Sequence, residues 1–201
     1  MAYPSYINAG TGVLTDSDAW VSIATTTLGS DTASVTFTST NDAQVGDFSQ
    51  YLDLVLISYM ATSRAAADDL MKCHLNGDTT SANYPYQYLW GDGSGTVEAS
   101  ATASGNRGID SRFCAGASST NVFTAIVMNF FDVNSGKYKS VLTQTANDMD
   151  AAIQASISAM TTSLWLSQAP ITSIVLAANV GPNLAAGSMF SLFGVLPRMV
   201  S

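Results

Sequence analysis

Charged residues are scarce in this sequence of 201 residues. They make up 11% of the chain, against roughly a quarter in a typical soluble domain, and the net charge is −8. Proteins that bind nucleic acids or anionic membranes present a basic face, and the 7 Lys and Arg residues here are spread too thinly to form one. We therefore expect neither nucleic acid nor a membrane surface as a partner.

The low charge also bears on how the protein stays in solution. A free monomer usually stays soluble by displaying charge, whereas a subunit of an assembly covers much of its surface with neighbouring proteins. Hydrophobic residues make up 47% of this chain. We therefore expect a homo-oligomer, or a protein held in a larger lattice, in preference to a free monomer.

The sequence shows neither a secretory signal nor a run of apolar residues long enough to span a membrane. The first basic residue is Arg64, so the N-terminal stretch lacks the positive region that opens a secretory signal. The run Leu52–Met60 is interrupted by Asp53 and Ser58 and is far shorter than the ~18 residues of a membrane span. These features predict synthesis in the cytoplasm with no membrane insertion.

Residues that hold metals or act as nucleophiles are few. Cys73 and Cys114 have no CxxC spacing and are predicted to be buried free thiols, although the sequence leaves a disulfide open. With His74 as the only histidine, a zinc site of three or four N or S ligands is not expected. The loop Asp92–Gly95 offers oxygen atoms, but not at the spacing of a calcium loop. We expect no metal and no other cofactor.

Catalytic patterns are missing as well. A general base needs an orienting carboxylate and a nucleophile within reach, and no such residues lie next to His74 in the sequence. Glu98 is the only glutamate, and the Asp residues fall mostly at turns and loop starts, which is an ordinary structural use of Asp. We predict no catalytic residue and a protein that is not an enzyme.

Short segments of alternating apolar and polar residues, separated by Gly, Ser, Asn and Asp, predict an all-β fold. The pattern is typical of a β-sandwich or jelly roll. We expect a single domain over 20–195, preceded by an arm or loop at 1–19 and followed by a tail at 196–201. The runs 20–28 and 33–39 read as one hairpin, and 122–133 with 138–145 as another.

Three segments carry more particular expectations. Residues 51–61 are apolar on both faces, which predicts a central strand, or a strand with one face against another subunit. In 148–164, four apolar residues recur at helical spacing, but the many Ser and Thr residues favour a strand or strand pair over a short helix. A turn at Asn76-Gly77-Asp78 is expected, because these residue types accept a positive φ.

The most distinctive local pattern is aromatic. Tyr84, Tyr86, Tyr88 and Trp90 recur at every second position, which would place all four rings on one face of an extended segment. One interpretation is a stacking platform for sugars or a partner protein. The other is a ladder buried in the core or in a subunit interface, with Pro85 marking an edge strand or a loop.

Several short motifs follow one another along the chain. They are YLDLVL at 51–56, LNGD at 75–78 with Asn83-Tyr84, Trp165 with ITSI at 171–174, and AGSMFSLFGV at 186–195. In that order they resemble a loosely defined group of tailed-phage virion proteins, common in aquatic phages and usually described as structural or tail-fibre-like. The stretch 148–162 departs from the pattern of that group.

The resemblance implies a β-sandwich mounted on the virion, without catalytic residues. We therefore expect a non-enzymatic structural protein that decorates the outside of the capsid or accompanies the tail. Its partners would be major capsid or tail proteins and further copies of itself. The alternative is a receptor- or carbohydrate-binding tail module that recognises a host surface glycan through the aromatic residues 84–90. A hydrolase is the least favoured interpretation.

Overall fold

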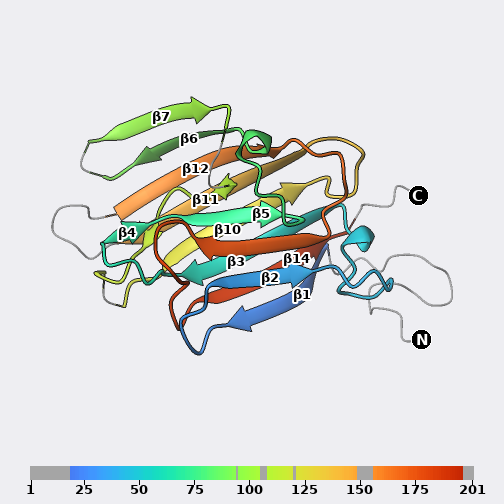
Figure 1. The fold of residues 1–201 in the computed structure, drawn as a ribbon, viewed down its shortest axis with the longest axis horizontal. Coiled ribbons are helices and arrows are strands. Elements are labelled where there is room, and N and C mark those ends of the chain that lie inside the picture. Colours follow the sequence, from blue (N-terminus) through green and yellow to red (C-terminus); the bar gives the residue numbers. More distant parts are fainter. Residues whose placement is uncertain (1–18, 94, 105–107, 120, 149–155, 197–201) are drawn as a thin grey trace.

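Two β-sheets of unequal size pack face to face in the computed structural model of the protein, which describes residues 19–93, 95–104, 108–119, 121–148 and 156–196 (Figure 1). The described residues contain strands and two short 3-10 turns, η1 (Phe48–Gln50) and η2 (Ser81–Asn83), but no α-helix. The predicted all-β class and single sandwich-like domain are confirmed.

The larger sheet has eight strands, all paired antiparallel. In spatial order they are β1 (Trp20–Thr27), β14 (Met189–Val195), β3 (Asp53–Met60), β10 (Thr124–Phe131), β11 (Lys139–Asp148), β12 (Ser156–Trp165), β6 (Tyr86–Gly91) and β7 (Val97–Thr102). Strands β1 and β7 therefore form its two edges, which lie at opposite sides of the molecule in Figure 1.

The smaller sheet has four strands and covers only part of the larger one (Figure 1). Its order is β2 (Ser34–Thr38), β13 (Ser173–Ala178), β5 (Met71–Leu75) and β8 (Ile109–Asp110). A two-stranded ladder of β4 (Asp68–Asp69) and β9 (Cys114–Ala115) lies beside it. The strands β6 and β7 extend past this second layer. The turn between β8 and β9 covers part of the inner side of β6, whereas β7 is exposed on both sides.

The core forms where alternate residues of the two sheets meet. Leu54 and Leu56 of β3 and Phe190 and Leu192 of β14 are buried from one sheet, and β2, β13 and β5 contribute their own alternate apolar residues from the other. Strand β3 lies between β14 and β10, which confirms the predicted central strand. Its second face, which includes Val55 and Ile57, is also largely apolar, and no other sheet of the described residues covers it.

The first predicted hairpin is wrong. The runs 20–28 and 33–39 do form β1 and β2, but β1 pairs with β14 in the large sheet and β2 pairs with β13 in the small one. Backbone hydrogen bonds tie the connection between them to 184–188: Leu28 donates to the Ser188 carbonyl and Thr32 to the Leu184 carbonyl. The connection thus crosses from one sheet to the other, which alternation within each strand cannot reveal.

Other local expectations are confirmed. Strands β10 and β11 pair as the predicted hairpin. Asn76 and Gly77 have φ of 52° and 70°, as the predicted turn requires. The ambiguous segment contains strand β12, in agreement with the favoured interpretation; its residues 149–155 lie outside the described ones, as do 1–18 and 197–201 of the predicted arm and tail. Among the described residues no helix is long and apolar enough to span a membrane.

Candidate functional site

Tyr84 does not join the other aromatic residues of the predicted ladder. It follows η2 with φ −125° and ψ 64°, before β6 begins, so the strand alternation does not reach it. Its side chain is fully buried, its hydroxyl donates to the Asp78 carbonyl at 2.8 Å, and the Leu75 amide donates to that hydroxyl at 3.1 Å. The prediction of four rings on one face is therefore wrong for Tyr84, which is a core residue that fixes the turn after β5.

The remaining three aromatic residues, Tyr86, Tyr88 and Trp90, form what we call the aromatic row of β6. They alternate onto the inner side of the large sheet, since they pair with Ser163, Thr161 and Ala159 of β12, all of which are buried. The rings of Tyr86 and Tyr88 lie 6.2 Å apart between centroids. The row is half-buried, because the small sheet does not extend over β6.

Two residues between β8 and β9 cover the aromatic row. The Arg112 guanidinium carbon lies 3.5 Å from the centroid of the Tyr88 ring, at the distance of a close cation–π contact, and Phe113 packs edge-on against Trp90 with centroids 5.0 Å apart. Arg112 has φ of 66°, and its amide donates to a carboxylate oxygen of Asp110 at 2.7 Å, which holds this turn in place. A ring face that a guanidinium already occupies is not open to a sugar.

Charges complete the packing around Tyr88. Arg112 lies 3.9 Å from a Glu98 carboxylate oxygen and 3.8 Å from one of Asp110, and the Tyr88 hydroxyl donates to Glu98. That hydrogen bond to Glu98 raises the pKa of the Tyr88 phenol. The sequence pattern identified the aromatic row, but it missed Arg112 and Phe113, which lie more than twenty residues later in the chain and have no spacing that relates them to β6.

Beneath the aromatic row the interior is polar. The hydroxyls of Thr143, Thr161 and Ser163 are buried and have no hydrogen-bond partner among the described residues, and the same holds for Nε1 of Trp90 and Nε of Arg112. Thr143 pairs with Thr161 across β11 and β12, so these groups lie on neighbouring strands. Buried groups of this kind are ordinarily satisfied by ordered water, which the polar lining here would accommodate.

His74 and the two cysteines, the candidates for catalytic or metal-binding residues, pack within the protein as structural residues. His74 packs edge-on against the Tyr84 ring, with centroids 5.8 Å apart. Its pKa is lowered by burial and by Lys72, although Asp78 acts in the opposite direction. Cys73 and Cys114 are both buried as free thiols, and burial raises the pKa of each. Within the described part of the chain, no three His, Cys, Asp or Glu side chains gather as metal ligands.

The opposite side of the large sheet, which we call the outer face, is a second candidate surface. No other sheet covers it in the described structure. Its members are the residues that alternate away from the core: 20, 22, 25 and 27 of β1; 189, 191, 193 and 195 of β14; 53, 55, 57 and 59 of β3; 125, 127, 129 and 131 of β10; 140, 142, 144 and 146 of β11; 158, 160, 162 and 164 of β12; 87, 89 and 91 of β6; and 97, 99 and 101 of β7.

This outer face is almost without charge. Among these positions Asp53 is the only charged residue, and it accepts a hydrogen bond of 2.7 Å from the Asp132 amide at the end of β10. The exposed side of the smaller sheet is different, since β5 carries Lys72 and His74 there. Apart from Asp53, the charged side chains that the structure describes therefore lie on loops, on the inner side of the large sheet or on the other sheets.

Large apolar side chains gather on the outer face. Twelve such side chains are exposed in the described residues, and only Leu52, Phe123, Tyr138 and Val180 lie elsewhere. The eight on the outer face are Trp20, Met189, Tyr59, Phe131, Leu164, Met160, Leu89 and Val97. Large exposed patches that combine apolar residues with little charge are typical of protein contact surfaces.

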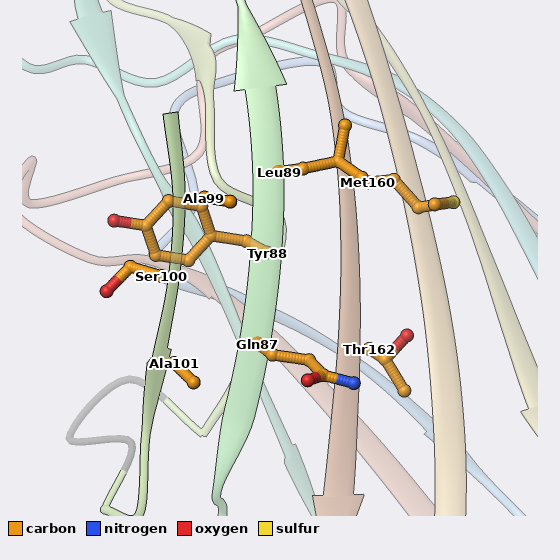
Figure 2. A pocket seen from close by; sticks show the side chains of 8 residues that line it. All are labelled: Gln87, Tyr88, Leu89, Ala99, Ser100, Ala101, Met160 and Thr162. Carbon is orange, nitrogen blue, oxygen red and sulfur yellow. The ribbon is translucent and has the colours of Figure 1, made fainter. Parts of the chain in front are cut away.

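A hollow of about 460 Å³ indents this surface near its β7 edge (Figure 2). Figure 2 shows its lining on three neighbouring strands: Gln87, Leu89, Ala99, Ala101, Met160 and Thr162 of the outer face, together with Tyr88 and Ser100, which alternate to the inner side. Ala99 and Ala101 are the outward residues of β7, and their short side chains stand beside the longer Leu89 and Gln87 of β6. The depression thus results from small residues at the edge strand.

No family model, curated protein or solved structure matches this chain. The roles of the outer face and the aromatic row are therefore inferred from their own residues. Of the two surfaces, the aromatic row already has partners within the protein, whereas the outer face has none among the described residues.

Proposed function

We propose that this protein is a non-enzymatic structural subunit of a phage virion, a capsid decoration or a tail-associated accessory, and that it is held in its assembly through the outer face. The observation that carries the proposal is a broad sheet surface that no described layer covers and on which Asp53 is the only charged residue among the described positions. The resemblance of the motifs between Tyr51 and Val195 to virion proteins supports the choice of assembly.

The physical reason is the balance between desolvation and contact. Charged side chains are the most costly to strip of water when two proteins meet; the hydroxyls of Thr and Ser cost much less, and apolar side chains gain from burial. The central rows of the outer face contain Ile57, Val127, Leu142 and Met160 with Ser, Thr and Gln between them. Burial of such a surface yields a favourable hydrophobic contribution without leaving an unpaired charge at the interface.

Recognition of a host glycan, the alternative function, receives less support from the aromatic row. Arg112 stacks on Tyr88, and Phe113 contacts Trp90, so a sugar would have to displace side chains that are already packed. Hydrolysis is supported least, since His74 contacts an aromatic ring and has no nucleophile among its described contacts.

A single charge at the centre of the outer face tests the proposal. Gln144 is exposed on β11, next to Val127 and Met160, so that Gln144→Lys should leave the fold intact and place an ammonium group in the contact. The matched control is Thr36→Lys, at an exposed strand position on the smaller sheet. Both variants would be introduced into the phage, and the protein bound to purified particles would be quantified.

The expected result is a loss of Gln144→Lys protein from the particles by at least about tenfold, because a buried unpaired charge costs several kcal/mol, with Thr36→Lys retained at the wild-type level. Circular dichroism of both purified variants checks that they fold. Equal retention of the two variants would contradict the proposal, and so would particles that never contain the protein.

A further inference from the structure

The occupant of the outer face is a second copy of this chain: we infer that two copies pack their eight-stranded sheets together, related by a twofold axis parallel to the strands. This inference rests on the proposed function, since it names the partner of the same surface. It follows from the charge, the relief and the size of the face.

Charge favours a second copy as the partner. Two chains that each carry a net charge of −8 repel one another unless their carboxylates stay apart. Asp53 is the only charged residue among the described positions of the outer face. It is the first residue of β3, and its carboxylate accepts a hydrogen bond from the Asp132 amide. A neutral surface meets a copy of itself without like charges opposite one another, whereas a basic or acidic partner would find no charge to pair with.

The relief of the outer face fixes the direction of the axis. One row across the sheet runs through paired residues from Phe193 on β14, by way of Asn129 on β10, to Gln87 and Ala101 at the hollow. The Phe193 ring is reinforced by Trp20, 6.2 Å away between centroids and half exposed. In this row the large ring of Phe193 therefore stands at one end and the small side chain of Ala101 at the other.

A twofold axis parallel to the strands keeps each row level and exchanges its two ends. The middle of the strand order lies between β10 and β11, so the axis there sets β14 and β1 of one copy opposite β6 and β7 of the other. Phe193 of each copy then meets the hollow around Ala101 of its partner, and this occurs twice in the dimer. Such an interface is isologous and closed, as homodimers require.

The size of the face suits a stable dimer. Seven spacings of ~4.8 Å between strands give a width of ~34 Å, and three two-residue steps along a strand give a height of ~20 Å. The product, ~700 Å² before side-chain relief is added, is close to the ~800 Å² that each partner contributes to a standard interface. Aligned packing of two sheets is also a common arrangement in β-sandwiches.

Sedimentation equilibrium of the purified protein tests the dimer. The wild-type chain and Thr36→Lys should both have the mass of a dimer at micromolar concentration. Gln144→Lys should weaken the dimer at least about tenfold through an unpaired charge, and Ala101→Trp should do so by filling the hollow. A wild-type chain that stays monomeric at ~100 μM would overturn the inference.

Spin labels on single introduced cysteines test the axis, and the native thiols do not interfere because they are buried. In the proposed dimer the two Gln144→Cys labels lie close together across the middle, while two Ala101→Cys labels are ~34 Å apart, since β7 occupies opposite ends of the pair. An axis across the strands would instead set β7 against β7. Short Ala101 distances would therefore refute the stated geometry.

The dimer and the proposed virion function can be refuted independently of each other. A monomeric wild-type chain combined with loss of Gln144→Lys from particles would mean that the face binds another virion protein. If the purified protein is a dimer but is absent from purified particles, the dimer inference stands and the virion function is refuted.

Discussion

Asp78 ties the two layers of the sandwich together at one end, and its removal gives a sharp test of the structure. Its carboxylate accepts hydrogen bonds from Trp165 Nε1 at 2.9 Å, Asn83 Nδ2 at 2.8 Å and the Thr80 amide at 2.9 Å. Trp165 ends β12 of the large sheet and is 2% exposed, whereas Asp78 follows the turn after β5 of the small sheet. In Asp78→Asn the charge is lost and a donor competes for the same partners.

The hydrogen bonds of Asp78 determine how much stability Asp78→Asn should lose. A hydrogen bond to a charged group contributes ~1.5–3 kcal/mol, and the partial exposure of Asp78 places the whole loss near the middle of that range, at about 2 kcal/mol. For a chain of this size that corresponds to a decrease in Tm of roughly 4–8 °C. Thermal and urea unfolding followed by circular dichroism measure both quantities. Trp165→Phe, which removes one donor and keeps a ring, should cost about 1 kcal/mol.

The pH dependence of this loss of stability can refute the assigned role of the Asp78 carboxylate. Burial alone would raise the pKa of Asp78, but the hydrogen bonds from Trp165, Asn83 and Thr80 outweigh it and lower the pKa to about 2. A lowered pKa stabilises the folded state above pH ~4, and this stabilisation is lost as the pH falls toward 2. The difference in unfolding free energy between wild type and Asp78→Asn should therefore shrink between pH 7 and pH 2.5. An unchanged difference would refute the reasoning, and Asp31→Asn, at an exposed loop, is the control.

Three further predictions concern the interior. Cys73 and Cys114 should not react with a thiol reagent in the native protein and should both react after denaturation, because both are buried and their pKa values are raised by burial. Thr161→Val should lower the free energy of unfolding by about 1 kcal/mol, because its hydroxyl has no partner among the described residues and the ordered water expected beside it would lose a hydrogen bond; an increase would show that the hydroxyl is unsatisfied. Gly194→Ala should lower stability by at least about 2 kcal/mol in urea unfolding, because a Cβ would come within 2.4 Å of the Tyr51 ring, whereas a neutral result would mean that the ring can move.

The sequence predicts local structure well where alternation decides it. Strand β3, the hairpin of β10 and β11 and the turn at Asn76 and Gly77 all follow from residue types within a few positions. The sequence does not show which strands share a sheet. The connection between β1 and β2 looks like a hairpin loop, and only its hydrogen bonds to 184–188, far along the chain, show that it joins two sheets.

The aromatic pattern illustrates the same limit at the level of a site. Period-two spacing correctly places Tyr86, Tyr88 and Trp90 on one side of β6. It wrongly adds Tyr84 to them, because β6 begins only at Tyr86 and the chain at Tyr84 is not in a strand. The spacing also does not indicate that Arg112 covers Tyr88. Contacts between distant segments depend on the fold as a whole.

The neutral outer face was partly visible in the sequence. The apolar second side of 51–61 predicted either a central strand or a contact with another subunit, and Val55 and Ile57 lie on the outer face next to β14 and β10. The extent of that face is a property of eight strands in a particular order. It emerges only when the order is known, since each strand by itself shows only three or four outward residues.

An electron-microscopy map of the intact particle tests the central claim most directly, because it shows which surfaces of the subunit are covered. We expect density for this sandwich on the particle, with the outer face of each eight-stranded sheet buried against another protein subunit. The side of the smaller sheet that carries Lys72 and His74 should lie nearer to solvent. A particle without this density, or a subunit whose outer face is open to solvent, would contradict it.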